Sequence, residues 1–204
     1  NCVAEDDSVL IAWSPGALVD AGDDQRACVT DFDVSLSGSV SVTTTTGTWT
    51  TSGTGTFDDA NDLTTIYHLS NDDKLLDSII ITLTSTNNGG FDANSDDLTV
   101  YIDELAVVNA GPDDAACANK TLLLNGNVTG GTATGAWTST GDGVFLPSST
   151  TLNASYVPGN ADKMSAGITL YLTSTNNGGC AEVTDNKVMS YTIPPFVEAG
   201  PDTS

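Results

Sequence analysis

The chain has 204 residues, enough for one or two domains that each bury a core of their own. It carries 27 acidic and 5 basic side chains, for a formal net charge of −22. Five cations cannot follow a nucleic-acid backbone, and an anionic membrane would repel such a chain. No apolar run approaches the roughly 20 residues of a membrane helix. The composition therefore excludes nucleic-acid binding and direct membrane insertion.

The sequence repeats itself with a period of 89 residues. The run Val-Asp-Ala-Gly-Asp-Asp at 19–24 returns in similar form at 108–113 and 197–202, and the seven residues 84–90 return unchanged at 173–179. The period predicts the end of one repeat at 1–18, whole repeats at 19–107 and 108–196, and the start of another at 197–204. We expect the segment to belong to a longer array.

Each repeat is predicted to consist of strands separated by turns. In chain order, residues 34–40 alternate apolar and polar, a Trp-centred strand surrounds Trp49, and a single helical turn is expected near 72–76. The strongest strand, 79–84, is followed by Asn-Asn-Gly-Gly, whose residues accept the positive φ of a tight turn. The last strand alternates through Leu98, Val100 and Ile102.

The second repeat has the same elements in the same order. Its counterparts are residues 122–128, the strand around Trp137, a helical turn near 160–166, strand 168–173, and a last strand whose inward positions are Lys187, Met189 and Tyr191.

This pattern predicts an all-β fold of tandem immunoglobulin-like β-sandwiches. We expect six or seven short strands in each repeat, no long helix, and both tryptophans buried between the sheets. The apolar residues expected to pack with them are Ile79, Ile81, Leu83, Leu170 and Leu172. Short linkers and the stiff pair Pro194-Pro195 predict a rod-like array of repeats aligned end to end.

Three motifs together resemble a known family of surface proteins. They are Val-Asx-Ala-Gly-Pro-Asp followed by Cys, Gly-Thr-Trp-Thr, and Thr-Ser-Thr-Asn-Asn-Gly-Gly-Cys. The combination is similar to the tandem repeats of the very large SprB-like gliding-motility adhesins of Bacteroidetes and, more broadly, to PKD-like immunoglobulin modules. The resemblance implies export by the type IX pathway and display as an outer-membrane-attached filament on the cell surface. The implied partners are neighbouring repeats, a surface polysaccharide or the substratum, and the gliding and secretion machinery.

The four cysteines lack the paired spacing of a zinc site, and an exported protein is expected to form disulfides. Pairing within a repeat gives Cys117–Cys180, and pairing across a linker gives Cys2–Cys28. Phe91 stands one period from Cys2 and from Cys180, where the repeat would otherwise have a cysteine. If every repeat used the same one of these two pairings, one cysteine would therefore have Phe91 as its partner. A Cys28–Cys180 bond leaves Cys2 and Cys117 free to pair with other repeats, so we favour it and keep Cys117–Cys180 as the alternative.

Two groups of acidic residues are candidate calcium sites, because hard cations prefer closely spaced oxygen ligands. The first alternates like the start of a calcium loop, and the second lies where the repeats meet. In neither case is a metal or other cofactor required for the fold, and a solvated acidic surface is the alternative interpretation. The two groups are Asp92, Asn94, Asp96 and Asp97, and Asp103, Glu104, Asp113 and Asp114.

Ser8 and Ser78 each follow an aspartate and precede an apolar residue. In proteins of the family that the chain resembles, this pattern marks O-glycosylation, so the resemblance implies glycans at both serines.

Catalysis is not expected. His68 is the single histidine, so a Ser/His/Asp triad could form in one repeat only, and we expect it to face solvent. The many carboxylates lack the aromatic platforms of a glycosidase, and Asp58, Asp59, Asp62, Asp72 and Asp73 are predicted to form a charged surface. The prediction is a structural and adhesive surface segment. The alternative is a carbohydrate-binding or spacer array of a secreted polysaccharide-degrading protein.

Overall fold

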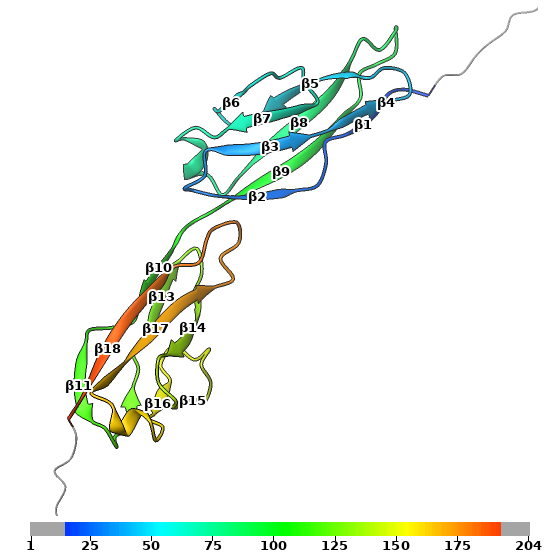
Figure 1. The fold of residues 1–204 in the computed structure, drawn as a ribbon. Helices are drawn as coiled ribbons and strands as arrows, with labels where there is room; N and C mark the ends of the chain where they lie inside the picture. The colour runs from blue at the N-terminus through cyan, green and yellow to red at the C-terminus, as the bar shows by residue number, and fades with distance from the viewer. Residues whose placement is uncertain (1–14, 193–204) are drawn as a thin grey trace, which may run out of the picture. The chain divides into compact units, whose positions relative to one another are not determined.

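The computed structural model describes residues 15–192, which divide into two compact units (Figure 1). Among the described residues, unit 1 contains 15–25 and 31–102, and unit 2 contains 26–30 and 103–192. The chain therefore passes between the units three times. Cys2, Ser8 and Pro194-Pro195 lie outside the described residues. The repeat boundary at 107/108 and the rod-like alignment stay predictions.

Residues 15–103 form nine short strands and one 3-10 helix. These elements are β1 (Leu18–Asp20), β2 (Gln25–Cys28), β3 (Asp33–Ser37), β4 (Ser39–Ser41), β5 (Thr46–Thr51), β6 (Thr56–Phe57), β7 (Thr64–His68), η1 (Asp73–Leu75), β8 (Ser78–Thr86) and β9 (Ser95–Asp103).

Residues 104–192 form the same series. It consists of β10 (Ala106–Asn109), β11 (Asp114–Cys117), β12 (Leu122–Leu123), β13 (Asn127–Gly130), β14 (Thr134–Ser139), β15 (Val144–Leu146), β16 (Ser155–Val157), η2 (Asp162–Met164), β17 (Gly167–Thr175) and β18 (Thr184–Thr192). The predicted helical turns are confirmed as η1 and η2. Among the described residues, no helix is long and apolar enough to cross a membrane.

The strands pair in the same order in both series. A four-stranded sheet has the order β2-β9-β8-β5, with the counterpart β11-β18-β17-β14. A three-stranded sheet, β3-β7-β6, corresponds to β12-β16-β15, and a two-stranded ladder, β1-β4, corresponds to β10-β13. The pairs β5–β8 and β8–β9 are antiparallel, whereas β11 runs parallel to β18. These layers form the predicted all-β sandwich.

One strand prediction in each repeat is wrong, because a glycine divides the expected strand into two. Residues 34–40 form β3 and β4, which pair with different partners, β7 and β1. Gly38 lies at the break, where an added Cβ would come within 2.7 Å of the Trp49 ring. Residues 122–128 divide in the same way into β12 and β13, and Gly126 lies equally close to Trp137. The chain therefore moves from one sheet to another at a position where only glycine fits against the tryptophan. Because each expected strand becomes two, the number of strands in a repeat exceeds the expected six or seven.

The predicted core is confirmed in both units. Trp49 and Trp137 are 2% and 1% exposed, and each indole N–H donates to a backbone carbonyl, of Asp62 and Leu152 respectively, at 3.0 Å. The predicted aliphatic partners are also buried: Ile79, Ile81, Leu83, Leu170 and Leu172. Lys187 occupies an inward position of β18, as the alternation predicts, and is 8% exposed.

The predicted tight turns after β8 and β17 are confirmed as well. Asn87 and Gly89 have φ values of 55° and 62°, and Asn176 and Gly178 have nearly the same values, 56° and 61°. Asparagine and glycine tolerate this left-handed conformation better than other residues, which explains why this sequence ends the strand.

A buried aspartate at the start of each 3-10 helix corrects the prediction that Asp73 lies on the charged surface. Asp73 is fully buried and accepts hydrogen bonds from the Tyr67 hydroxyl at 2.8 Å and from the backbone N–H groups of Thr54, Gly55 and Ser70 at 2.7–3.1 Å. Burial raises the pKa of the Asp73 carboxyl, but these donors outweigh it and hold the pKa below its usual value.

Unit 2 repeats this arrangement around Asp162. Its carboxylate accepts from the Tyr156 hydroxyl at 2.7 Å and from the N–H groups of Asp142 and Gly159, both at 3.0 Å. Desolvation raises the pKa values of the Tyr67 and Tyr156 hydroxyls, which keeps both neutral as donors. In each unit the aspartate thus joins the 3-10 helix to two loops and a core tyrosine.

Candidate functional site

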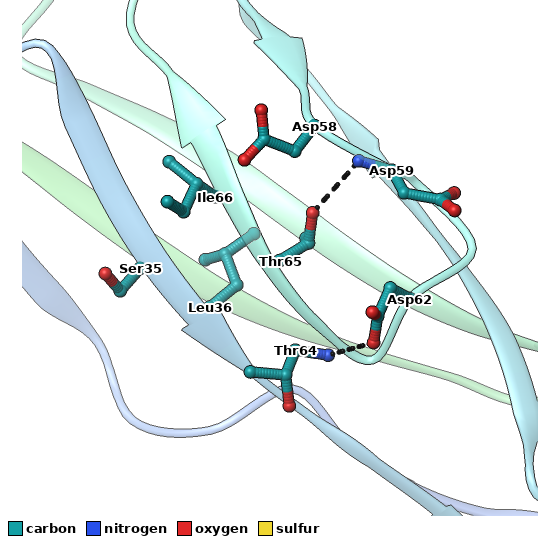
Figure 2. Close-up of a pocket in the computed structure, with 8 residues that line it drawn as sticks. All are labelled: Ser35, Leu36, Asp58, Asp59, Asp62, Thr64, Thr65 and Ile66. Atoms are coloured by element: carbon teal, nitrogen blue, oxygen red, sulfur yellow. Dashed lines mark hydrogen bonds between the residues drawn. The ribbon is translucent and has the colours of Figure 1, made fainter.

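Unit 1 contains an acidic pocket of about 390 Å³ on its three-stranded sheet (Figure 2). Strands β3 and β7 and the loop before β7 supply its lining, which consists of Ser35, Leu36, Asp58, Asp59, Asp62, Thr64, Thr65 and Ile66. Three carboxylates and three hydroxyls lie around two aliphatic side chains. Such an oxygen-rich lining can accept hydrogen bonds from a sugar or an amine.

Local hydrogen bonds fix the loop that carries these carboxylates. The Asp62 carboxylate accepts from the backbone N–H of Thr64 at 3.0 Å, and the Asp59 carboxylate accepts from Asn61 N–H at 2.8 Å. The Asp59 N–H donates to the buried Thr65 hydroxyl at 3.2 Å. The sequence prediction treated Asp58, Asp59 and Asp62 only as surface charge, whereas the fold of the loop brings them around one concavity.

His68 lies beside this pocket, between two carboxylates. Its Nδ1 is 2.7 Å from Asp33 and its Nε2 is 2.8 Å from Asp58, which also lines the pocket. The hydrogen bonds to Asp58 and then Asp33 raise the pKa of His68 above its usual value. The side chain is 42% exposed, in keeping with the predicted solvent-facing position. Because carboxylates contact both ring nitrogens, neither nitrogen is available to activate a serine hydroxyl.

Unit 2 lacks the acidic lining. The residues that match the pocket loop, 146–152, contain no aspartate or glutamate, and Val157 occupies the place of His68. The acidic lining is thus a feature of unit 1, whereas the strands and core beneath it occur in both units.

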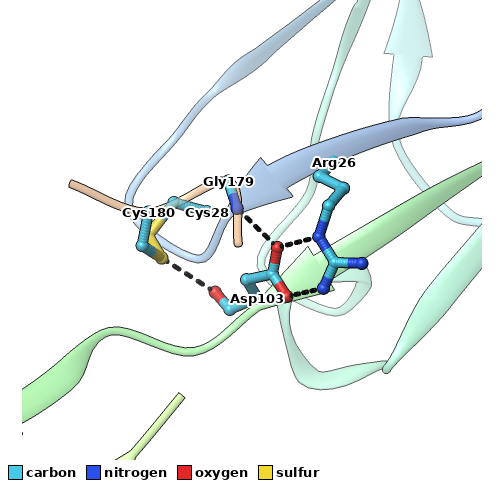
Figure 3. Close-up of polar contacts among 5 residues, drawn as sticks. All are labelled: Arg26, Cys28, Asp103, Gly179 and Cys180. Atoms are coloured by element: carbon cyan, nitrogen blue, oxygen red, sulfur yellow. Dashed lines mark hydrogen bonds and ion pairs between the residues drawn. A yellow bond between two sulfur atoms is a disulfide. The ribbon is translucent and has the colours of Figure 1, made fainter. Parts of the chain in front are cut away.

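The second candidate site surrounds a disulfide in unit 2 (Figure 3). Cys28 and Cys180 are bonded to each other, with their Cα atoms 4.7 Å apart. This is the pairing that the sequence favoured over Cys117–Cys180, and Cys117 is an exposed free cysteine in the structure.

Asp103 organises the residues around this disulfide. Its carboxylate forms a two-pronged ion pair with Arg26 and accepts from Gly179 N–H at 2.7 Å. Its carbonyl oxygen accepts from Val29 N–H at 2.9 Å and lies 3.2 Å from the Cys180 sulfur. The Arg26 guanidinium is the main cause of the lowered pKa of Asp103. Sequence reasoning missed this ion pair, although Arg26 is the single arginine of the chain.

The predicted calcium ligands are mostly engaged with backbone groups instead of with one another. In the first group, Asp96 accepts from Ala21 N–H at 2.8 Å and the Asn94 amide donates to Ala17 at 2.9 Å, while Asp92 and Asp97 are exposed. The bond from Ala21 recurs in unit 2, where Ala110 N–H donates to Asp185 at 2.8 Å.

The second predicted group is also divided among separate partners. Asp113 accepts from Val188 N–H and Asp114 from its neighbour Ala115, both at 2.8 Å, and Glu104 is exposed. Residues 15–192 contain no cluster of three or more His, Cys, Asp or Glu side chains placed to share a metal ion. Calcium binding stays a prediction, as does glycosylation of Ser78, the half-buried first residue of β8.

Comparison with known proteins identifies the fold. No family model and no curated protein sequence matches the chain. Among solved structures, extracellular domains 3–5 of Drosophila OTK match with a TM-score of 0.54 and 12% identity, over 83% of this chain and 59% of that one. The fold is an immunoglobulin-like β-sandwich.

Two further solved structures support the same fold. Immunoglobulin domains 1–5 of Sidekick-1 match with a TM-score of 0.52 and 11% identity, over 89% of this chain and 40% of that one. An I-band fragment of titin matches with a TM-score of 0.52 and 12% identity, over 87% of this chain and 66% of that one. The chain therefore spans less than two thirds of the OTK and Sidekick-1 structures. Likeness at this level of identity concerns the fold alone.

Proposed function

We propose that this chain is a structural and adhesive segment of a long, extracellular cell-surface protein. The observation that carries the proposal is what the two units have in common. They share strand order, a buried tryptophan and a buried Tyr–Asp hydrogen-bond network, whereas the acidic lining of the unit 1 pocket does not recur at the matching residues of unit 2, 146–152. A scaffold that repeats while the side chains of its pocket do not is expected of a protein that spans distance.

The resemblance of the repeats to gliding-motility adhesins supports the finer form of the proposal. In that form, the chain belongs to a surface filament, exported by the type IX pathway, whose contacts with a substratum support gliding. The strongly acidic composition keeps such a β-rich array soluble and discourages pairing between strand edges.

Surface labelling and bead adhesion test the proposal. An antibody against the purified chain should label intact source cells, and beads coated with the chain should adhere under flow to polysaccharide-coated glass. A matched acidic protein of similar size on the beads provides the control for charge. Labelling only after permeabilisation would refute surface display, and adhesion no stronger than that of the control would refute the adhesive role.

The pocket provides one observation in favour of carbohydrate binding. Its carboxylates and hydroxyls can accept hydrogen bonds from sugar hydroxyls, although Trp49 and Trp137, the tryptophans among the described residues, are buried and offer no stacking platform. Glycan-array binding by the wild-type chain, lost in the triple variant Asp58→Asn, Asp59→Asn and Asp62→Asn, would favour this alternative. We expect the array to show no selective ligand.

A further inference from the structure

The disulfide divides the chain into a closed loop and two short ends. Cys28 and Cys180 are separated by 152 positions, so the 151 residues from 29 to 179 lie between the two bonded cysteines. Strands β3–β17 lie entirely within this loop, and with them both core tryptophans. Strands β1, β2 and β18 lie on the ends of the chain that the bond joins.

We propose that the Cys28–Cys180 disulfide is a load bypass. Tension applied along the chain passes from Cys28 through the two sulfur atoms to Cys180, because this is the shortest covalent path. Residues 29–179 then bear no tension between the chain ends. The inference deepens the proposed function and rests on it for its biological relevance, because a spacer on a cell surface must resist extension.

Strand β18, one of the three strands that remain under tension, can lengthen very little. Beyond Cys180, the load passes through β18, which pairs with β17 through Thr184–Ser190 and with β11 through Met189–Thr192. A paired strand is already extended to about 3.3 Å per residue, close to the limit of a stretched chain. Separating β18 from its neighbours therefore adds almost no length while the disulfide is intact.

The surroundings of the bond protect it from reductants and hold its ends in place. Cys28 is 2% and Cys180 8% exposed, so dissolved thiols have little access to either sulfur. The Arg26–Asp103 ion pair and the Gly179–Asp103 hydrogen bond join the residues that precede each cysteine. In contrast, Cys117 occupies the place of Cys28 in the next repeat but is exposed and free, which makes it a matched control.

Single-molecule stretching of the whole chain, attached by its two ends, tests the bypass. The oxidised wild type should extend only through its ends. The double variant Cys28→Ala, Cys180→Ala should release the loop as well, adding on the order of 50 nm of contour length for 151 residues at about 3.6 Å each. Cys117→Ser should stretch like the oxidised wild type. Circular dichroism establishes that each variant is folded before it is pulled.

If the double variant does not fold, wild type that has been reduced in denaturant and alkylated replaces it, because total contour length can be measured whether or not that chain refolds, and the same gain in length is expected. Equal contour lengths for the oxidised chain and for a chain whose complete alkylation has been verified would overturn the proposal, as would a Cys117–Cys180 peptide in a non-reducing digest. Neither result depends on where the protein is displayed or what it adheres to. A failed bypass and a failed adhesion assay are therefore separate outcomes.

Discussion

Unit 1 and unit 2 have the same interior but different surfaces. Both bury a tryptophan beside a glycine at a strand break, and both bury an aspartate that accepts a hydrogen bond from a tyrosine hydroxyl. On the three-stranded sheet, unit 1 carries Asp58, Asp59, Asp62 and His68, whereas unit 2 carries uncharged residues. The comparison indicates that packing restricts the interior of a repeat, while its exposed loop can acquire a site of its own.

The largest expected effect concerns the shared core. Trp49→Ala and Trp137→Ala should each lower the free energy of unfolding by about 3–5 kcal/mol, because each leaves a cavity in the core. Urea titration monitored by circular dichroism measures the change. The exposed pair Leu75→Ala and Met164→Ala are matched controls, expected within about 0.5 kcal/mol of wild type. Near-wild-type stability of a tryptophan variant would contradict the common interior.

Substitution of the buried aspartates should cause the next largest loss of stability. Asp73→Ala removes the acceptor of the Thr54 and Ser70 N–H groups and of the Tyr67 hydroxyl. We therefore expect a loss of about 2–4 kcal/mol, and a similar loss for Asp162→Ala. Because the folded-state pKa of Asp73 is lowered, its ionised form stabilises the fold above the unfolded pKa of about 3.9. This contribution is lost as pH falls through the folded-state pKa. The stability difference between wild type and Asp73→Asn should therefore shrink in acid, and a pH-independent difference would refute this account.

A difference between the two interiors gives a smaller effect. Tyr191 occupies the place of Ile102, and its buried hydroxyl has no hydrogen-bond partner among residues 15–192. Burial raises its pKa to about 12, so the hydroxyl is neutral at ordinary pH. Tyr191→Phe should leave stability unchanged or raise it by up to about 1 kcal/mol, whereas Tyr156→Phe should cost more because Asp162 loses a donor. A clear loss in Tyr191→Phe would indicate a bridging water.

The smallest effect concerns His68, which has no counterpart in unit 2. Its NMR titration should have a midpoint above 6.5, and Asp58→Asn should lower that midpoint. Because the folded-state pKa is raised, the stability that the ion pairs contribute is complete below about pH 6.5 and is lost as pH rises through the folded-state value. A midpoint at or below 6.5 would show that the two carboxylates do not stabilise the protonated His68 ring.

The interior was largely predictable from the sequence because it recurs. The alternation in residues 79–84 and 168–173 located the central strands, the paired tryptophans located the core, and Asn-Asn-Gly-Gly located the turns. These signals are local or repeat within the chain. They therefore needed no knowledge of which strands lie side by side.

The features that the sequence did not reveal depend on tertiary contacts. Gly38 divides a well-patterned strand only because the Trp49 ring lies against it, and Asp73 is buried because loops distant in sequence turn their N–H groups toward it. The pocket escaped prediction for the same reason, since its aspartates resemble any charged loop until β3 and β7 pair beneath them. A charged residue is difficult to place from its neighbours in sequence alone.

The membership of residues 26–30 in unit 2 has a consequence for biosynthesis. A ribosome adds about 5–20 residues per second, so Cys28 precedes its partner Cys180 by roughly 8–30 s. During that interval Cys117 is made, and it becomes the first cysteine after Cys28 with which a premature bond could form. Correct pairing therefore requires that oxidation wait until the later part of the chain has been made, so the order of translation and the timing of thiol oxidation must be matched.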